Sequence, residues 1–407
     1  MSTPVDESAA RRAGMSMRHR ADLPVMVLCL LPLATLTLYL ICRRSGAFCD
    51  FTAYWGAARV FFAHQNPYAQ QPLFDIQRSV GWPSAGAIRA YNPPWTLPLF
   101  APIGLLPFAA AQILWLVLSL AIEAFAALSM WRFFGGAPRL RWIALLVALT
   151  FVALGETDRL GQITPLILGG LVAFLLLVRA ERWFTAGLFL LPALGAKPHI
   201  TWLFAMAVLL WSIRQRRWRL LFGALTALAA ATVIVALFDP AAFHYFGNIY
   251  GEAMDQICGL GGGLRILFGT QHTWLQYAPC IPGLAWLCWY WARHRGAWSW
   301  PDHAPLVLLI SLVSSPYAWH LDYIVALPAF VALAARGAWR SPLVVFGWLV
   351  VQVAVFASPS HGIDALASAL WIPFFVLAGR AAHSRGQEQT ARHDSERILD
   401  VPHPALH

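Results

Sequence analysis

Apolar runs long enough to cross a lipid bilayer recur along this chain, and no other feature limits its fold so strongly. A helix needs about 20 mainly apolar residues to span the hydrocarbon layer. The 407 residues are 59% hydrophobic and 12% charged, and that charged fraction is about half of the usual value for soluble domains. The sequence therefore predicts an all-α, polytopic membrane protein.

The apolar runs predict about twelve transmembrane helices. The first run has no signal-peptide cleavage site and further spans follow it, so we interpret it as a retained helix. This divides the chain into an N-terminal tail (1–22), a membrane domain (23–380) and a disordered polar tail (381–407). The predicted spans are 23–42, 108–131, 140–155, 163–179, 183–196, 199–213, 218–238, 275–292, 303–314, 319–335, 341–357 and 363–379.

Basic residues set the predicted orientation, because loops that stay in the cytoplasm are enriched in arginine and lysine. With the N-terminus inside, most of the 29 basic residues fall in cytoplasmic segments, and both termini are cytoplasmic. The net charge of +10 has this cause, so no nucleic-acid partner is expected. We expect a multi-pass protein of the plasma (inner) membrane whose polar side chains gather on the outer, periplasmic or extracellular, face.

Two outer segments are predicted to form amphipathic helices that lie flat in the membrane interface. In 51–62 the apolar residues recur at helical spacing, and in 242–257 an aromatic stripe faces a polar side. Aromatic residues also gather at interfaces for structural reasons alone, so this pattern does not by itself indicate a site.

Asp50 follows the first predicted span closely and stands between two apolar neighbours, Cys49 and Phe51. A carboxylate at the membrane boundary is often only a solvated surface group. Burial between apolar residues would instead fix its orientation and tune its pKa, as a general base requires. We therefore predict Asp50 as the candidate catalytic base.

Lys197 is the only lysine in the chain, and it lies in an outer connection, against the general distribution of basic residues. Its compact ammonium suits a phosphate oxygen at headgroup depth. The alternative is a lysine that merely extends to the interface. We favour phosphate binding, and we count His199 in the same loop among the substrate-binding candidates.

Two more outer stretches carry polar candidates. In GETDRLGQ, Gln162 is well placed to bond a sugar hydroxyl or a phosphate, whereas Glu156 and Asp158 are interpreted as a solvated turn. In SSPYAWHLDY, His320 and Asp322 lie near the outer end of a predicted span, where an ionisable side chain is a functional candidate.

Three features give weaker signals. The stretch GLGGGLRILFG follows no predicted strand, so we interpret it as a flexible loop in which Arg265 is a phosphate-binding candidate. Glu123, inside the second span, is interpreted as an acid of the bundle interior, with no partner evident from the sequence. The six cysteines lack CxxC and metal-ligand spacings, and free thiols are favoured over a disulfide.

Five motifs, in this order along the chain, resemble glycosyltransferase family 87. The similarity extends roughly from residue 48 to residue 335, and Ile163 and Leu321 depart from the family's pattern. The motifs are Asp50-Phe51 with Trp55, Tyr91 with Pro93-Pro94, Gly161-Gln162, Lys197-Pro198, and Ser315-Pro316-Tyr317 with Asp322.

The resemblance implies a GT-C fold and a polyprenyl-phosphate sugar donor, with mannose as the sugar in characterised relatives. It implies transfer to a glycan or glycolipid acceptor on the outer face, with inversion at the anomeric carbon and Asp50 as the base. Through the family's motifs, Trp55 and Tyr91 join the substrate-binding candidates. Neither a metal nor a cofactor is expected, and the expected partners are membrane lipids and the two substrates.

Two other classes of protein stay open at this stage. A secondary transporter would suit twelve spans, but transporters usually place their polar residues near the membrane midplane in repeated halves, and no repeat is evident here. A non-catalytic assembly partner would be insensitive to a change of Asp50. The concentration of polar residues on one face and the series of motifs favour the glycosyltransferase.

Overall fold

A computed structural model describes residues 49–254, 257–356 and 370–380, and every regular element within these ranges is helical. The prediction of an all-helical protein is confirmed for this part of the chain. The first predicted span (23–42) and the predicted tails (1–22 and 381–407) lie outside the described residues.

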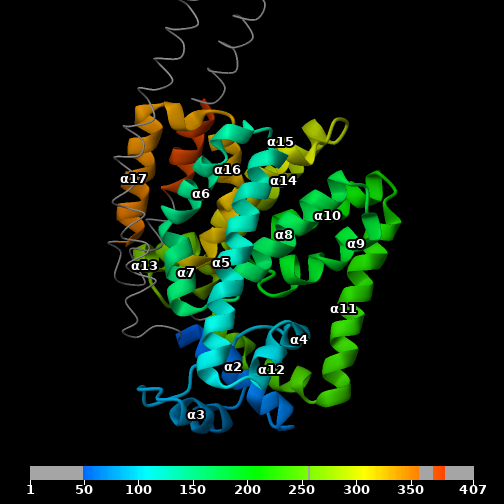
Figure 1. Cartoon of the computed structure of the whole chain (residues 1–407), viewed down its shortest axis with the longest axis vertical. Coiled ribbons are helices and arrows are strands. Elements are labelled where there is room, and N and C mark those ends of the chain that lie inside the picture. The colour runs from blue at the N-terminus through cyan, green and yellow to red at the C-terminus, as the bar shows by residue number, and fades with distance from the viewer. Residues whose placement is uncertain (1–48, 255–256, 357–369, 381–407) are drawn as a thin grey trace, which may run out of the picture.

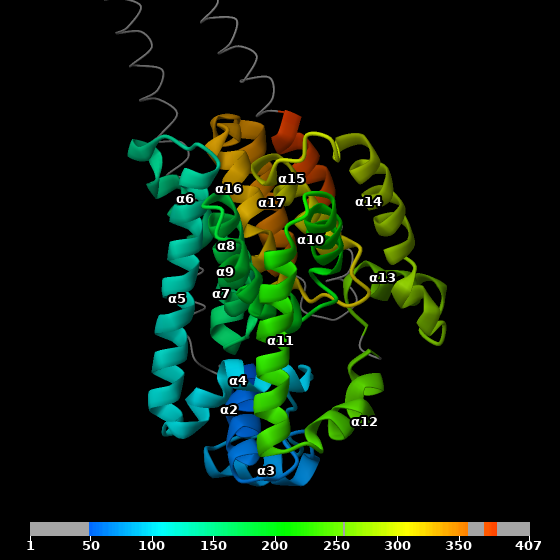
Figure 2. The same ribbon diagram turned by 90° about the vertical axis from the view of Figure 1, so that its right-hand side faces the viewer.

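The helices form a lower layer and an upper bundle, which two long helices join (Figures 1 and 2). The long helices are α5 (Phe108–Phe133) and α11 (Trp218–Phe238). The lower layer contains α2 (Cys49–Phe62), α3 (Gln70–Ser79), α4 (Leu97–Phe100) and α12 (Ala242–Met254). The bundle contains α6 (Trp142–Leu149), α7 (Val152–Leu160), α8 (Thr164–Arg179), α9 (Trp183–Leu188), α10 (Trp202–Arg214), α13 (Gly259–Phe268), α14 (Cys280–His294), α15 (Trp300–Val313), α16 (Leu327–Ala335) and α17 (Pro342–Phe356).

The helices α5 and α11 are long and apolar enough to cross a bilayer, with 26 and 21 residues. Most of each helix is exposed, and the exposed side chains include Ile113 and Val117 on α5 and Phe222 and Leu225 on α11. Apolar surface of this extent is stable against lipid and not against water. The chain is therefore a membrane protein.

A third candidate span is bent. The segments 138–149 and 152–160 are together long and apolar enough to cross a bilayer, but they meet at an angle of 60°. The other apolar helices in the described ranges have 10–17 residues, so the observed helices are mostly shorter than the predicted spans. The predicted span 319–335, for example, is a 3-10 helix, η6 (His320–Ala326), followed by α16.

The bend between α6 and α7 is supplied with hydrogen-bond partners by α17. Thr150 Oγ1 accepts a hydrogen bond from Trp348 Nε1 at 3.1 Å, and Val152 N donates to Gln352 Oε1 at 2.9 Å. Because backbone groups in an apolar setting must find partners within the protein, these contacts allow the chain to bend there. α7 ends at Gly161, whose positive φ of 68° favours glycine, and Gln162 follows at once.

The helix predicted over 51–62 exists as α2, but its predicted position on the membrane surface is wrong. Ten of its fourteen residues are buried. Its aromatic residues serve two sides of the helix, because Phe51 packs against Trp115 of α5 and Phe61 packs against Phe238 of α11. A helix that is apolar on more than one side belongs to the core.

The long connection between α11 and α14 was predicted to hold an amphipathic helix and a flexible glycine-rich loop. The helix is observed, and the loop is not. α12 buries Ala242 and Ile249 and exposes His244, as an amphipathic helix does. The glycine-rich stretch is the helix α13 and not a flexible loop. A Cβ atom on Gly261 would lie 2.3 Å from the carbonyl oxygen of Gln276, so glycine allows α13 to pack closely against η5 (Thr273–Tyr277).

Candidate active site

A cavity of about 620 Å³ lies between the lower layer and the bundle. Its walls come from segments far apart in the chain: α2, residues 88–93, residues 160–162, residues 196–202 and residues 317–321, with Phe246 of α12. This volume is within the range of small-molecule sites. The predicted site residues that line the cavity are Asp50, Tyr91, Gln162, Lys197, His199 and His320.

Asp50 is the second residue of α2 and faces the cavity. Burial raises the pKa of Asp50, while the Lys197 ammonium and the Gln162 amide favour its charged form and oppose that rise. A buried carboxylate with a perturbed pKa that lines a cavity is typical of functional acids and bases. The electrostatics suit the general base predicted from the sequence.

Gln162 binds Asp50 directly. Its Nε2 donates to Asp50 Oδ2 at 2.5 Å, and its Oε1 accepts a hydrogen bond from the Tyr54 hydroxyl at 2.9 Å. The backbone beside Gln162 is also fixed, because Trp115 Nε1 donates to the carbonyl oxygen of Gly161 at 3.1 Å. Both polar atoms of the Gln162 side chain therefore have partners within the protein.

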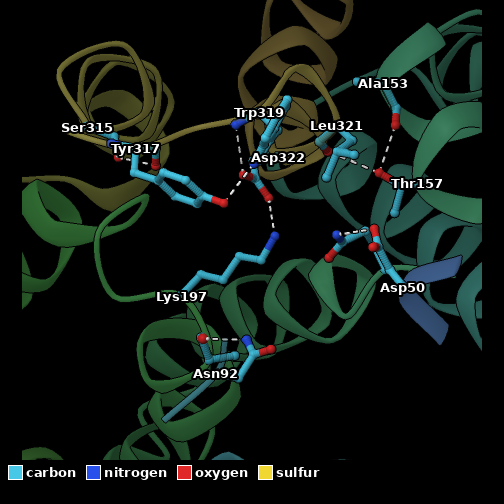
Figure 3. A network of polar contacts seen from close by, with 12 residues as sticks. Asp50, Asn92, Ala153, Thr157, Lys197, Ser315, Tyr317, Trp319, Leu321 and Asp322 are labelled. Atoms are coloured by element: carbon cyan, nitrogen blue, oxygen red, sulfur yellow. Dashed lines mark hydrogen bonds and ion pairs between the residues drawn. The ribbon is translucent and has the colours of Figure 1, made fainter. Parts of the chain in front are cut away.

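Lys197 forms a buried ion pair with Asp322. The Lys197 Nζ lies 2.6 Å from Asp322 Oδ1, and Figure 3 shows the lysine extending from its loop toward this carboxylate. The other oxygen, Oδ2, accepts a hydrogen bond from the Trp319 backbone N–H at 3.0 Å, and the Asp322 side chain is fully buried. Asp322 therefore lies behind the cavity wall, where it holds Lys197 in place.

The motif Tyr-Asn-Pro-Pro-Trp fixes the backbone that leads into Lys197. Asn92 Nδ2 donates to the carbonyl oxygen of Ala196 at 2.9 Å, and Trp95 Nε1 donates to that of Gly195 at 3.1 Å. The Tyr68 hydroxyl in turn donates to the carbonyl oxygen of Asn92 at 3.0 Å. Contacts between the lower layer and the bundle thus position the lysine.

His199 and Tyr317 form an aromatic part of the cavity wall, with ring centroids 5.2 Å apart. Burial lowers the pKa of His199 to about 4, so its ring is neutral at pH 7. The buried Nε2 of His199 has no hydrogen-bond partner among the described residues. A buried ring nitrogen of this kind is suited to a hydrogen bond with a ligand hydroxyl.

Residues 90–273 match the model of glycosyltransferase family 87. The matched segment is similar to this family, and the match supports a glycosyltransferase. The match confirms the resemblance seen in the motifs, over a shorter segment than residues 48–335. It includes Tyr91, Gln162 and Lys197.

A relative from Mycobacterium tuberculosis (strain CDC 1551 / Oshkosh) is a polyprenol-phosphate-mannose-dependent alpha-(1-2)-phosphatidylinositol pentamannoside mannosyltransferase. It is 26% identical over 300 residues, which cover 66% of this chain. The matched region spans 65% of the relative, a little less than two thirds of its length. No solved structure matches the chain.

Besides Asp322, two predicted site residues, Trp55 and Arg265, lie outside the lining of the cavity. Trp55 is buried against Phe108, and its Nε1 donates to the carbonyl oxygen of Leu106 at 3.1 Å. Arg265 is buried and donates to Thr270 O at 2.9 Å and to Gln276 Oε1 at 3.3 Å. Trp55 anchors α2 and Arg265 joins α13 to η5, so neither side chain is placed as a substrate ligand.

The residues Tyr54, Arg89 and Asn92 also line the cavity and were not predicted as site residues, and Tyr317, named only as part of a motif, lines it too. Helical spacing was a usable signal for Tyr54, because residues four apart on α2 share a face, and Asp50 is four residues earlier. No signal in the sequence singled out Arg89, which donates to Gln70 Oε1 at 3.2 Å.

Asp158 was interpreted as part of a solvated turn, and this is wrong. Its side chain is buried beside that of Glu123, across the contact between α7 and α5. Asp158 is therefore the acidic neighbour of Glu123 that the sequence did not indicate, and no hydrogen bond joins the two side chains among the described residues. Glu156 is likewise part of the helix α7 and not of a turn, and its partly buried carboxylate pairs with Arg159 at 2.7 Å. Neither Glu123 nor Asp158 lines the cavity, and among the described residues no cluster of His, Cys, Asp or Glu side chains could hold a metal ion.

Proposed function

We propose that this protein transfers a hexose, mannose by analogy with the relative, from a polyprenyl-phosphate donor to a glycan or glycolipid acceptor. The observation that carries the proposal is the shared cavity of Asp50 and Lys197, which puts a candidate base and a candidate phosphate ligand against one volume. The polyprenol-phosphate-mannose dependence of the relative supports the donor class.

The reaction is a single displacement at the anomeric carbon. Asp50 removes the proton from an acceptor hydroxyl, and the acceptor oxygen forms a bond to that carbon. The bond between the anomeric carbon and the phosphate oxygen breaks, its electron pair stays on that oxygen, and polyprenyl phosphate leaves. Attack opposite the leaving group inverts the anomeric configuration. His199, with its buried Nε2 unpartnered among the described residues, is suited to hold a hydroxyl of the sugar or the acceptor.

Lys197 acts on the charge that moves during this step. Before transfer, one negative charge is on Asp50; afterwards Asp50 is neutral and the departing phosphate carries one more negative charge. The Lys197 ammonium is close enough to Asp50 to favour its ionised form. Once Asp50 is protonated, the same ammonium is free to stabilise the phosphate, which is how a fixed charge accelerates a displacement.

The proposal includes the membrane arrangement expected from the sequence: about twelve spans, a GT-C architecture, cytoplasmic termini and a cavity open to the outer face of the plasma membrane. Arginine-bearing connections support this orientation. The loops that join α5 to α6, α10 to α11, α14 to α15 and α16 to α17 lie in the upper half of Figures 1 and 2, away from α2 and α12 beside the cavity. By the positive-inside rule, that end faces the cytoplasm.

The test measures transfer by the purified protein in liposomes. The donor is radiolabelled polyprenyl-phosphate mannose, the acceptor is a glycolipid extract from bacterial membrane, and the variant is Asp50→Asn. We expect the variant to lose about 10²- to 10⁴-fold in rate, the usual contribution of general-base catalysis. Asp302→Asn is the matched control, because Asp302 is an exposed carboxylate paired with Arg336, which follows α16, and lies outside the cavity wall.

Wild-type transfer rates in Asp50→Asn would remove Asp50 from the mechanism. Transfer from a nucleotide-activated mannose, with none from the lipid-linked donor, would refute the donor class.

A further inference from the structure

The hydrogen bonds around Asp50 form a directed chain that runs from Tyr54 through Gln162 to the carboxylate. The Tyr54 hydroxyl donates to Gln162 Oε1, so the amide presents its Nε2 donor to Asp50 Oδ2. The Tyr54 ring is buried against Phe100 and Trp115, at centroid distances of 5.4 and 6.4 Å. The hydroxyl that orients the amide is therefore itself held in place.

We infer that Gln162 and Tyr54 are positioning residues that orient Asp50 and favour its ionised form, in place of the sugar- or phosphate-binding role expected for Gln162. The inference rests on the proposed role of Asp50 as the base. An ionised carboxylate only accepts hydrogen bonds, so it needs the N–H side of the amide. Tyr54 supplies the donor that the amide oxygen then requires. The two hydrogen bonds form together only when Gln162 presents Nε2 to Asp50 and Oε1 to Tyr54.

The hydrogen bonds from Tyr54 through Gln162 leave one oxygen of Asp50 for the reaction. Oδ2 is held by Gln162, whereas Oδ1 is contacted by the weak Cys49 thiol at 3.8 Å. Oδ1 is therefore the oxygen that takes the acceptor proton. A base whose second oxygen is fixed presents one defined proton acceptor to the cavity.

Charged and titratable groups from several elements act on Asp50 beside this chain. Cys49 lies on α2 itself, Arg159 on α7, and Lys197 in the loop that precedes α10. Asp322 belongs to η6, and Tyr317 precedes it. None of these groups changes when Gln162 or Tyr54 is substituted. A change in the titration of Asp50 in these variants is therefore caused by the loss of the hydrogen bonds from Gln162 and Tyr54.

The test follows the pH dependence of kcat/KM in Gln162→Met and Tyr54→Phe. Methionine keeps the length of glutamine without its donor, so the acid limb should move to higher pH by about one to two units, the size of one hydrogen bond to a charged group. Tyr54→Phe should move the limb in the same direction by less, because the donor remains but loses its anchor. Tyr290→Phe is the control, since it removes a buried hydroxyl that contacts His303 at 2.7 Å outside the cavity.

A rise in KM for Gln162→Met with an unchanged acid limb would overturn the inference and return Gln162 to a substrate ligand. If the buried Tyr54 hydroxyl prevents Gln162→Met from folding, the double variant Tyr54→Phe/Gln162→Met removes both polar groups and should show the same shift.

Infrared titration of the Asp50 carboxyl band, identified by its loss in Asp50→Asn, separates this inference from the proposed function. A shifted midpoint in Gln162→Met supports the positioning role of Gln162 even if Asp50→Asn still transfers sugar. That second result would refute only the role of Asp50 as the base. An unshifted midpoint refutes the positioning role of Gln162 even if Asp50→Asn is inactive.

Discussion

The buried ion pair between Lys197 and Asp322 should be worth far more to this protein than an ion pair at its surface. The side chains are 10% and 0% exposed, and the two atoms are 2.6 Å apart. Removing either partner leaves the other charge buried without compensation, which costs about 3–5 kcal/mol. Asp322→Asn would in addition bring an amide donor against the ammonium, or leave Trp319 N without its acceptor.

The double variant Lys197→Met/Asp322→Asn removes both charges and should cost much less than the sum of the two single changes. We expect a coupling energy of about 3 kcal/mol or more from the double-mutant cycle. The assay is reversible unfolding by SDS in mixed micelles, followed by tryptophan fluorescence.

A second cycle at Arg336 and Asp302 is the matched control. This pair is 3.2 Å apart, but its side chains are 41% and 65% exposed. Solvent screens such a pair, so its coupling energy should stay below about 1 kcal/mol. A coupling at Lys197 and Asp322 no larger than the control would refute the argument that burial makes this pair strong. The single variants should also lose transfer activity, because each displaces Lys197 from its place.

Three further outcomes follow from the structure. Since burial lowers the pKa of His199 to about 4, below its unfolded value, stability should fall as the pH drops from about 6.5 toward 4; His199→Gln should lessen that fall in acid unfolding curves. Gly187→Ala would place a Cβ 2.1 Å from a carbonyl oxygen of α11 and should cost at least about 1–3 kcal/mol in SDS unfolding, whereas Gly296→Ala, which meets nothing within 4 Å, should be nearly neutral. Gln352→Leu removes the acceptor of the Val152 N–H and should cost about 1–3 kcal/mol by the same assay, and an unchanged midpoint would mean that the bend before α7 finds another partner.

Comparison of α2 with α5 shows where sequence reasoning succeeds and where it stops. The α5 helix was predicted over 108–131 and observed over Phe108–Phe133, because a long uninterrupted apolar run has only one way to satisfy its backbone in lipid. The α2 helix was predicted correctly as a helix and incorrectly as a surface element. Its helical period is a local property, whereas its burial depends on α3, α5 and η2 (Ala101–Leu105), which lie elsewhere in the chain.

The candidate site divides in the same way. Asp50, Lys197, Gln162 and His199, which line one cavity, could be predicted as candidates because unusual residues at predicted loop positions stand out in an apolar chain. The role of Gln162 was not found, because an amide is equally suited to bind a sugar and a carboxylate. The orientation of the Gln162 amide depends on the hydrogen bond from Tyr54, and that contact joins residues 108 positions apart.

Composition and the lengths of the apolar runs determined by themselves that this chain is helical and lies in a membrane, because hydrocarbon excludes unpaired backbone groups whatever the tertiary arrangement. The order of the motifs indicated a resemblance to glycosyltransferase family 87. Tertiary structure alone decided that Asp322 holds Lys197, that Gln162 holds Asp50, and that Asp158 lies beside Glu123. The physical reason is that hydrogen bonds and ion pairs act over about 3 Å, a distance that only the folded chain sets between residues more than a hundred positions apart in the first two cases.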